Sequence, residues 1–234
     1  MSQSPQVPTS RGPLNAAFDN DPEGYQQLRD CWLNRRREAF LASELNGLAA
    51  GSRVLEIGCG TGWLLAHRAK ASPHVEWVGV DPLESYISFA RRNSPLPNLR
   101  FLTGTAESVD QLTEPGFHVI LSNDMLHHVE SQAEVAKSLR RLAAPGCRWL
   151  AIEPNCLNFY TFLRQALKHG ERNFWPSEFL GHAHEAGWKQ VAQRYLFLIP
   201  PFVKEPTSLA ISLERRFEKW APIAGGICVE LTTA

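Results

Sequence analysis

VLEIGCGTG, residues 54–62, decides the fold of this chain, because a short apolar run passes directly into a turn that contains three glycines. A second apolar run ends at Asp81, which places a carboxylate at the tip of the next expected strand. In a parallel sheet such a pair of strands holds an adenosine: the glycine turn brings backbone close to the ligand, and the acid accepts the ribose hydroxyls. The sequence therefore predicts a nucleotide-like cofactor between the turn and Asp81.

Apolar runs and helical patterns alternate from about residue 51 onward. Helices are expected at 63–71, 84–93 and 176–186, and another begins at the capping box of Ser131 and Glu134. The strand runs are apolar throughout, which is typical of strands buried on both faces of a largely parallel sheet. The expected strands are 53–57, 75–80, 99–103, 117–122, 149–153, 190–199 and 226–232.

A single domain is expected over residues 16–234, since no linker-like stretch divides the chain. Residues 1–15, rich in Ser, Gln and Pro, are expected to form a disordered tail. Three segments lie outside the alternating pattern and are expected to form helical caps, near 18–47, 154–175 and 200–225.

The composition excludes several classes of protein. Lys plus Arg equals Asp plus Glu at 24 each, so nothing attracts the chain to nucleic acid. No apolar run is long enough to span a membrane, and the cluster Arg35–Arg37 is read as a solvated helix face. Five scattered cysteines without CxxC spacing indicate reduced thiols. We therefore predict a cytoplasmic protein that acts on a small molecule; the sequence gives no oligomeric state.

Two cofactor classes use a strand, a glycine turn and a distant acid. The dinucleotide fingerprint needs Gly or Ala where this chain has Trp63, and a Trp would hold the helix too far from the strand. The GxGxG spacing, with Glu56 two residues before the first glycine, instead resembles motif one of the class I S-adenosylmethionine-dependent methyltransferases, in particular the small-molecule and quinone-biosynthesis group. Four further stretches resemble later motifs of that family in order: 77–82, 102–107, 119–129 and 142–147.

The resemblance implies a Rossmann-like, doubly wound α/β fold. Its mostly parallel sheet would have seven strands with an antiparallel last strand, and helices on both faces. The cofactor would be S-adenosylmethionine, with Asp81 on the ribose and Glu56 near the ammonium group. Thr105 departs from the family, which often has Asp at the adenine end. The cofactor residues implied are Glu56, Gly58, Cys59, Gly60, Gly62, Asp81, Pro82, Thr105, Ala106, Glu107 and Asn123.

The loop after the fourth expected strand carries the candidate catalytic residues. His127 is the preferred general base, because an imidazole exchanges protons near neutrality. Asp124, His128 and Glu153 are the other catalytic candidates. The alternative is that one histidine caps the helix near Ser131 and the other packs in the core.

A metal ion is a second hypothesis for the same loop. Asp124, His127 and His128 would supply one carboxylate and two imidazoles, a set that suits iron, zinc or manganese. Related quinone methyltransferases have acidic residues at the first two of these places, so the resemblance allows a divalent ion here.

Substrate contacts are expected from Tyr25, Asn155 and Tyr160, which lie in or beside the cap segments. Leu213, Phe217 and Trp220 share one helix face and are expected to close a pocket over an apolar acceptor. The acceptor is therefore expected to be hydrophobic or aromatic, methylated on oxygen or carbon. Two alternatives stay open: a protein that binds the cofactor without catalysis, and a non-methyl reaction such as an isomerisation or cyclisation.

Overall fold

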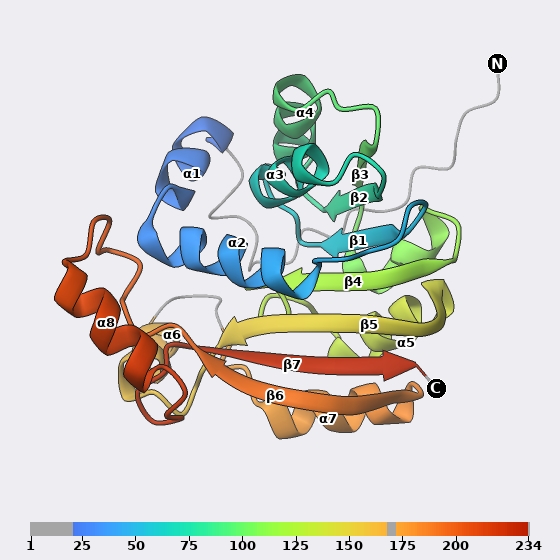
Figure 1. Cartoon of the computed structure of the whole chain (residues 1–234). Helices are drawn as coiled ribbons and strands as arrows, with labels where there is room; N and C mark the ends of the chain where they lie inside the picture. Colours follow the sequence, from blue (N-terminus) through green and yellow to red (C-terminus); the bar gives the residue numbers. More distant parts are fainter. Residues whose placement is uncertain (1–20, 168–171, 234) are drawn as a thin grey trace, which may run out of the picture.

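The computed structural model describes residues 21–167 and 172–233, so the expected tail at 1–15 lies outside the described residues. One sheet of seven strands forms the middle layer, in the order β3-β2-β1-β4-β5-β7-β6 (Figure 1). All pairs are parallel except those of β7, which runs antiparallel to both β5 and β6. The predicted sheet, including its antiparallel last strand, is confirmed. The strands are β1 (Arg53–Ile57), β2 (Glu76–Asp81), β3 (Leu99–Thr103), β4 (Phe117–Asn123), β5 (Ala143–Pro154), β6 (Trp188–Leu196) and β7 (Gly226–Thr233).

Helices cover both faces of the sheet, because every central strand is apolar on both sides. One face packs against α2 (Trp32–Glu44), α3 (Trp63–Ala71) and α4 (Glu84–Asn93), through Leu41, Leu65 and Ile87 among others. The other face packs against α5 (Gln132–Leu142) and α7 (Pro176–Glu185). These two apolar layers fix the strand ends, and with them the turns that follow the strands.

The indole rings of β5 and β6 anchor the second layer. Trp149 and Trp188 are buried with ring centroids 5.2 Å apart, and Trp149 meets Phe179 of α7 edge-on at 5.1 Å. Each indole N–H has a partner: Trp149 donates to the Ser122 hydroxyl and Trp188 to the Ala136 carbonyl, both at 3.0 Å. Buried tryptophans pair their N–H groups in this way because an unpaired donor is costly.

Three helices lie outside this sandwich at the carboxyl ends of the parallel strands. They are α1 (Pro22–Arg29), α6 (Phe159–Leu167) and α8 (Ser208–Phe217). Figure 1 shows α1 above the end of β1 and α8 at the left edge of the molecule, with α6 behind it. The short 3₁₀ helix η2 (Ala106–Gln111) follows β3. No helix within residues 21–167 and 172–233 is long and apolar enough to cross a membrane.

Candidate functional site

The glycine turn between β1 and α3 is held in a conformation that only glycine adopts without strain. Gly58, Gly60 and Gly62 have φ values of +69°, +55° and +72°. Space is a second constraint, since a Cβ on Gly58 would lie 2.6 Å from the Met125 Cβ. The N–H groups of Gly58 and Cys59 donate to the Val80 carbonyl at 2.8 and 3.1 Å, which ties the turn to β2. The turn therefore presents backbone rather than side chains at this edge of the sheet.

Asp81, at the end of β2, braces the same turn. Its Oδ2 accepts the Gly60 N–H at 2.8 Å, and its Oδ1 accepts the Leu83 N–H at 3.0 Å. Burial raises the pKa of this carboxyl to about 6, although both N–H groups act to lower it. Each carboxylate oxygen has a second lone pair, so Asp81 still has the capacity to accept ribose hydroxyls while holding the turn.

Glu56 is the most perturbed acid beside the turn. It is 2% exposed near the end of β1, and its Oε2 has no hydrogen-bond partner among the described residues. Burial raises the pKa of its carboxyl to about 8; Arg29 opposes this shift and Asp81 adds to it. A buried carboxylate without a partner is costly, and a cationic group bound beside it removes that cost. The ammonium of an adenosylmethionine fits this position by charge.

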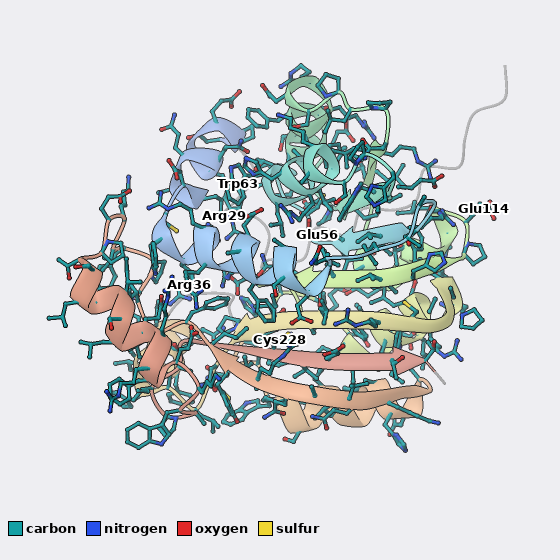
Figure 2. The ribbon with its side chains drawn as sticks, viewed as in Figure 1. Arg29, Arg36, Glu56, Trp63, Glu114 and Cys228 are labelled. Atoms are coloured by element: carbon teal, nitrogen blue, oxygen red, sulfur yellow. The ribbon has the colours of Figure 1, made fainter. Side chains whose placement is uncertain are left out.

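A narrow pocket opens over the turn, with a free volume of about 20 Å³. Figure 2 shows Arg29 at the end of α1, Trp63 at the start of α3 and Glu56 grouped at this edge of the sheet. The Tyr25 ring covers the turn: a Cβ on Gly60 would lie 3.3 Å from its Cε1. The lining residues are Tyr25, Arg29, Asn34, Arg37, Glu56, Gly58, Cys59, Thr61, Trp63, Leu64 and Asn123.

Arg37 is a site residue that the sequence reading missed. It is 5% exposed, so the reading of Arg35–Arg37 as a solvated face is wrong for this member of the cluster. Its Nη2 lies 2.5 Å from Oδ2 of Asp124, and its Nη1 donates to the Asn34 side chain at 3.2 Å. The one sequence signal for this contact was the spacing of Asn34 and Arg37, because residues three apart share a helix face.

Asp124 is anchored rather than open to solvent. Its backbone is left-handed, with φ +54°. Burial alone would raise the pKa of this carboxyl, but Arg37, Arg29 and His127 together lower it below its ordinary value. An ionised carboxylate committed to a guanidinium is a weak proton acceptor, which argues against Asp124 as the general base.

His127 and Glu153 form a buried pair that joins the loop after β4 to the end of β5. The Nδ1 of His127 lies 2.7 Å from Oε2 of Glu153, which is fully buried. The other carboxylate oxygen of Glu153 accepts the N–H groups of Met125 and Leu126 at 3.0 and 2.8 Å. When Nδ1 carries the proton and donates it to Glu153, Nε2 is the basic nitrogen of the ring. The His128 ring lies 4.0 Å from that of His127, centroid to centroid.

A second cavity, of about 200 Å³, is lined by a later part of the same loop. His127 lines this cavity, whereas Asn123 lines the pocket over the glycine turn. Most of its other walls are polar and come from residues 129–133 and from Arg172, Asn173, Glu178 and His182. No local sequence pattern indicated this cavity, because its two walls are far apart along the chain.

Other predicted contacts lie away from both cavities. Asn155 is 1% exposed and donates to the carbonyls of Ala221 and Ala224, so it holds the chain before β7. Tyr160 is 49% exposed and meets the Phe202 ring at 6.5 Å. At the expected adenine end, the hydroxyl groups of Thr105 and Ser108 form a hydrogen bond of 3.0 Å, and Ala106 packs in the core. The carboxylate of Glu107 accepts the Glu130 N–H at 3.0 Å. Pro82 directly follows Asp81.

The metal hypothesis gains no support from the geometry. In the part of the chain that the structure describes, no group of three or more His, Cys, Asp or Glu side chains is arranged to hold an ion. Asp124 is directed to Arg37, and the Nδ1 of His127 to Glu153. All five cysteines lie within the described residues and are free and buried. Burial raises the pKa of the Cys59 thiol well above its ordinary value, so it contributes backbone rather than a nucleophile.

Comparison with known proteins agrees with this arrangement. Residues 54–146 match a family described as "Methyltransferase domain". The chain is 32% identical over 118 residues to an uncharacterized methyltransferase of Mycobacterium bovis, covering 50% of this chain and 54% of the relative. It is 34% identical over 134 residues to a ubiquinone biosynthesis O-methyltransferase of Hahella chejuensis, covering 52% and 56%. The chain thus spans about half the length of these relatives.

The fold has close counterparts among solved structures. A SAM-dependent methyltransferase from Archaeoglobus fulgidus superposes with a TM-score of 0.67, covering 89% of this chain and all but 1% of its own. The sequences are 14% identical, so this likeness establishes the fold. The part of the chain in the family match contains the glycine turn, Asp81 and the loop that carries His127.

Proposed function

We propose that this chain, which belongs to the class I S-adenosylmethionine-dependent methyltransferases, transfers the methyl group of S-adenosylmethionine to a small molecule. The observation that carries the proposal is Glu56, a buried carboxylate with an unpartnered oxygen, beside a backbone turn braced by Asp81. A dinucleotide would bring two phosphates and no cation toward this edge. An adenosylmethionine brings an ammonium and a ribose, the two groups that these acids are suited to bind.

The backbone of the turn and the side chains around it then each have a role in binding the cofactor. Asp81 accepts the ribose hydroxyls with its remaining lone pairs, and the backbone of Gly58–Gly62 contacts the methionine half. Glu56 becomes fully ionised when the ammonium binds, since a neighbouring cation lowers the pKa of a carboxyl. Tyr25 and Arg29 close over the bound molecule and exclude water, which favours a reaction that consumes positive charge. When bound, the cofactor supplies an already activated methyl group.

The acceptor is proposed to lose its proton to Nε2 of His127. Glu153 fixes the ring through Nδ1, and the two N–H groups of Met125 and Leu126 fix Glu153. A hydroxyl or an acidic carbon needs such a base, whereas a neutral amine does not. The name of the Hahella chejuensis relative supports an oxygen acceptor. Because His127 lines the cavity of about 200 Å³, that cavity is the proposed route of the acceptor to the base.

Calorimetry with S-adenosylmethionine, its demethylated product and a nicotinamide dinucleotide tests the cofactor. The first two are expected to bind, and Asp81→Asn and Glu56→Gln are each expected to weaken them by about tenfold or more. Glu114→Gln is the matched control, since Glu114 is exposed at the opposite end of the sheet (Figure 2). Binding of the dinucleotide alone would overturn the proposal.

Turnover is tested separately with methyl-labelled cofactor and a panel of small phenols, acids and amines. Label in the product establishes methyl transfer. Cofactor binding with an altered but unlabelled product identifies a non-methyl reaction, and binding with no product from any acceptor identifies a binding protein. The same assay with a metal chelator decides the metal hypothesis, because a metal-assisted acceptor would lose turnover.

A further inference from the structure

The helix α8 packs with one acidic side chain, Glu214, directed inward. Glu214 is 0% exposed, and its carboxylate accepts the N–H groups of residues 198 and 199, both at 3.0 Å. The Trp32 indole donates to it at 2.8 Å, and the Arg36 Nε lies 3.2 Å away. Figure 2 shows Arg36 between α2 and α8. A buried and fully bonded acid therefore fixes which way α8 faces.

An apolar stripe on α8 is exposed. Leu209, Leu213 and Phe217 are spaced four residues apart, and their exposed fractions are 68%, 44% and 38%. Trp220, just beyond the helix, is 62% exposed. Surface helices of a globular protein turn such a stripe toward the core. In this structure the face points to solvent and lines neither of the two cavities described above, so the expectation that it closes a pocket over the acceptor stays a prediction.

The helix α6 repeats the same inversion. Its buried residues are polar, Thr161 and Gln165, and neither polar atom of the Gln165 side chain has a hydrogen-bond partner in the described structure. Its exposed residues are apolar: Phe159, Leu163 and Leu167 are 77%, 43% and 75% exposed. Two helices that both direct apolar residues outward indicate a surface that is covered in use.

The two stripes belong to one region at the carboxyl ends of the strands. The Asn158 side chain donates to the Ile223 carbonyl at 2.7 Å, which ties the start of α6 to the segment after α8. The ring of Tyr160, on α6, meets that of Phe202, on the loop before α8. Together they form the outer apolar surface, defined as Phe159, Leu163, Leu167, Phe202, Leu209, Leu213, Phe217 and Trp220.

The exposed charged side chains of α8 and its end have one sign, whereas the exposed Glu205, in the loop before α8, is paired with Arg35. Both acids of α8 and its end, Glu214 and Glu218, turn inward to Arg36. The charged residues left exposed there are Arg215, Arg216 and Lys219. The chain as a whole has a net charge of zero, so this basic edge is local.

We propose that the outer apolar surface docks on an anionic phospholipid bilayer, with α6 and α8 lying in the interface. Amphipathic helices that combine an apolar face with basic residues bind in this way, and aromatic rings such as Trp220 and Tyr160 are favoured at the headgroup level. The basic edge selects anionic headgroups. A symmetric dimer through the same surface would bring two copies of that edge together, and like charges repel.

Sedimentation of the full chain with lipid vesicles tests the proposal. Vesicles of phosphatidylcholine with phosphatidylglycerol are expected to carry the protein down, and vesicles of phosphatidylcholine alone much less. Leu213→Glu is expected to weaken binding by about tenfold or more, and Val191→Glu, on the exposed edge strand β6, to leave it unchanged. Arg215→Glu with Arg216→Glu is expected to abolish the preference for anionic lipid. Arg92→Glu with Arg100→Glu, exposed at the far edge of the sheet, is the charge-matched control.

Other outcomes overturn the proposal. Protein that stays in the supernatant at about 150 mM salt does not recognise the bilayer. Equal binding by Leu213→Glu and the parent chain places the contact elsewhere. A dimer in light scattering that Leu213→Glu converts to a monomer, without vesicle binding, makes a second copy the occupant. Thermal unfolding of each variant, expected to match the parent because the substituted side chains are exposed, guards against misfolding.

Discussion

Nδ1 of His127 lies 2.7 Å from a carboxylate oxygen of Glu153 whose partner oxygen is held by two backbone N–H groups. This fixed carboxylate sets the tautomer of the imidazole. Glu153 is therefore proposed as a positioning residue, acting through His127, rather than as the base that the sequence allowed.

Glu153→Gln is expected to lower kcat by about 10²–10³-fold. The amide oxygen of Gln accepts the two backbone N–H groups, so its NH₂ group faces Nδ1. The ring must then carry its proton on Nε2, where it no longer accepts one. The KM for the cofactor is expected to stay within about twofold, since the change does not touch the turn.

His127→Ala is the companion variant, and its loss of kcat is expected to be of similar size. The double variant is expected to be no slower than either single one, because both remove the same base. Multiplied losses in the double variant would show that the two residues act independently.

Glu56 predicts how stability depends on pH without ligand. The pKa of this carboxyl is about 8 in the folded protein and 4.5 in the unfolded reference, so the folded state binds the extra proton between these values. The free energy of unfolding therefore decreases as pH rises from 4.5 to about 8. Asp81, with a pKa of about 6, contributes a slope of the same sign below that pH, so Glu56→Gln is expected to remove the slope chiefly between pH 6 and 8. At pH 8 the variant is expected to be more stable than the parent by about 2–4 kcal/mol. Denaturant titrations at several pH values measure the difference; a parent slope unchanged in the variant contradicts it.

The same carboxyl links cofactor binding to proton release. Near pH 7 Glu56 is mostly protonated without ligand, and an ammonium bound beside it favours the charged form. Close to one proton is expected to leave per cofactor bound. Calorimetry in buffers of different ionisation enthalpy counts that proton, and Glu56→Gln is expected to release none. Proton uptake on binding would rule out the ammonium contact.

The pair of Arg37 and Asp124 predicts a coupling energy. Removing one partner leaves a largely buried charge, so Arg37→Met is expected to destabilise the fold by about 2–3 kcal/mol. Arg37→Met with Asp124→Asn is expected to recover part of that loss, and Asn tolerates the left-handed backbone at 124. Strictly additive losses in this double-mutant cycle would show that the pair contributes nothing.

How much of the site was predictable depends on whether topology or packing placed each residue. The glycine turn, Asp81 and Asn123 follow three parallel strands, and parallel strands end at one edge, so their meeting followed from the sequence. Arg37 reaches that edge because of how α2 crosses the sheet. Its spacing from Asn34 puts the two residues on one helix face but does not say that this face is buried. Helical spacing likewise marked Leu213 and Phe217 as one face of α8. Spacing does not say whether a face points inward, and here the buried Glu214 decided it.

Tyr25 predicts how the cofactor enters. The pocket over the turn has a free volume of about 20 Å³, far below the roughly 300 Å³ or more of small-molecule sites, so its walls must move to admit a ligand. The Tyr25 ring lies over Gly60, and α1 buries none of its own residues, which makes this helix the wall that moves most readily. Tyr25→Ala is expected to raise the dissociation rate of the cofactor about tenfold, with a smaller change in the association rate. Leu28→Ala, on the same helix but 73% exposed, is the matched control and is expected to leave both rates unchanged. Stopped-flow displacement measures the two rates; equal dissociation from both variants would mean that α1 does not cover the bound cofactor.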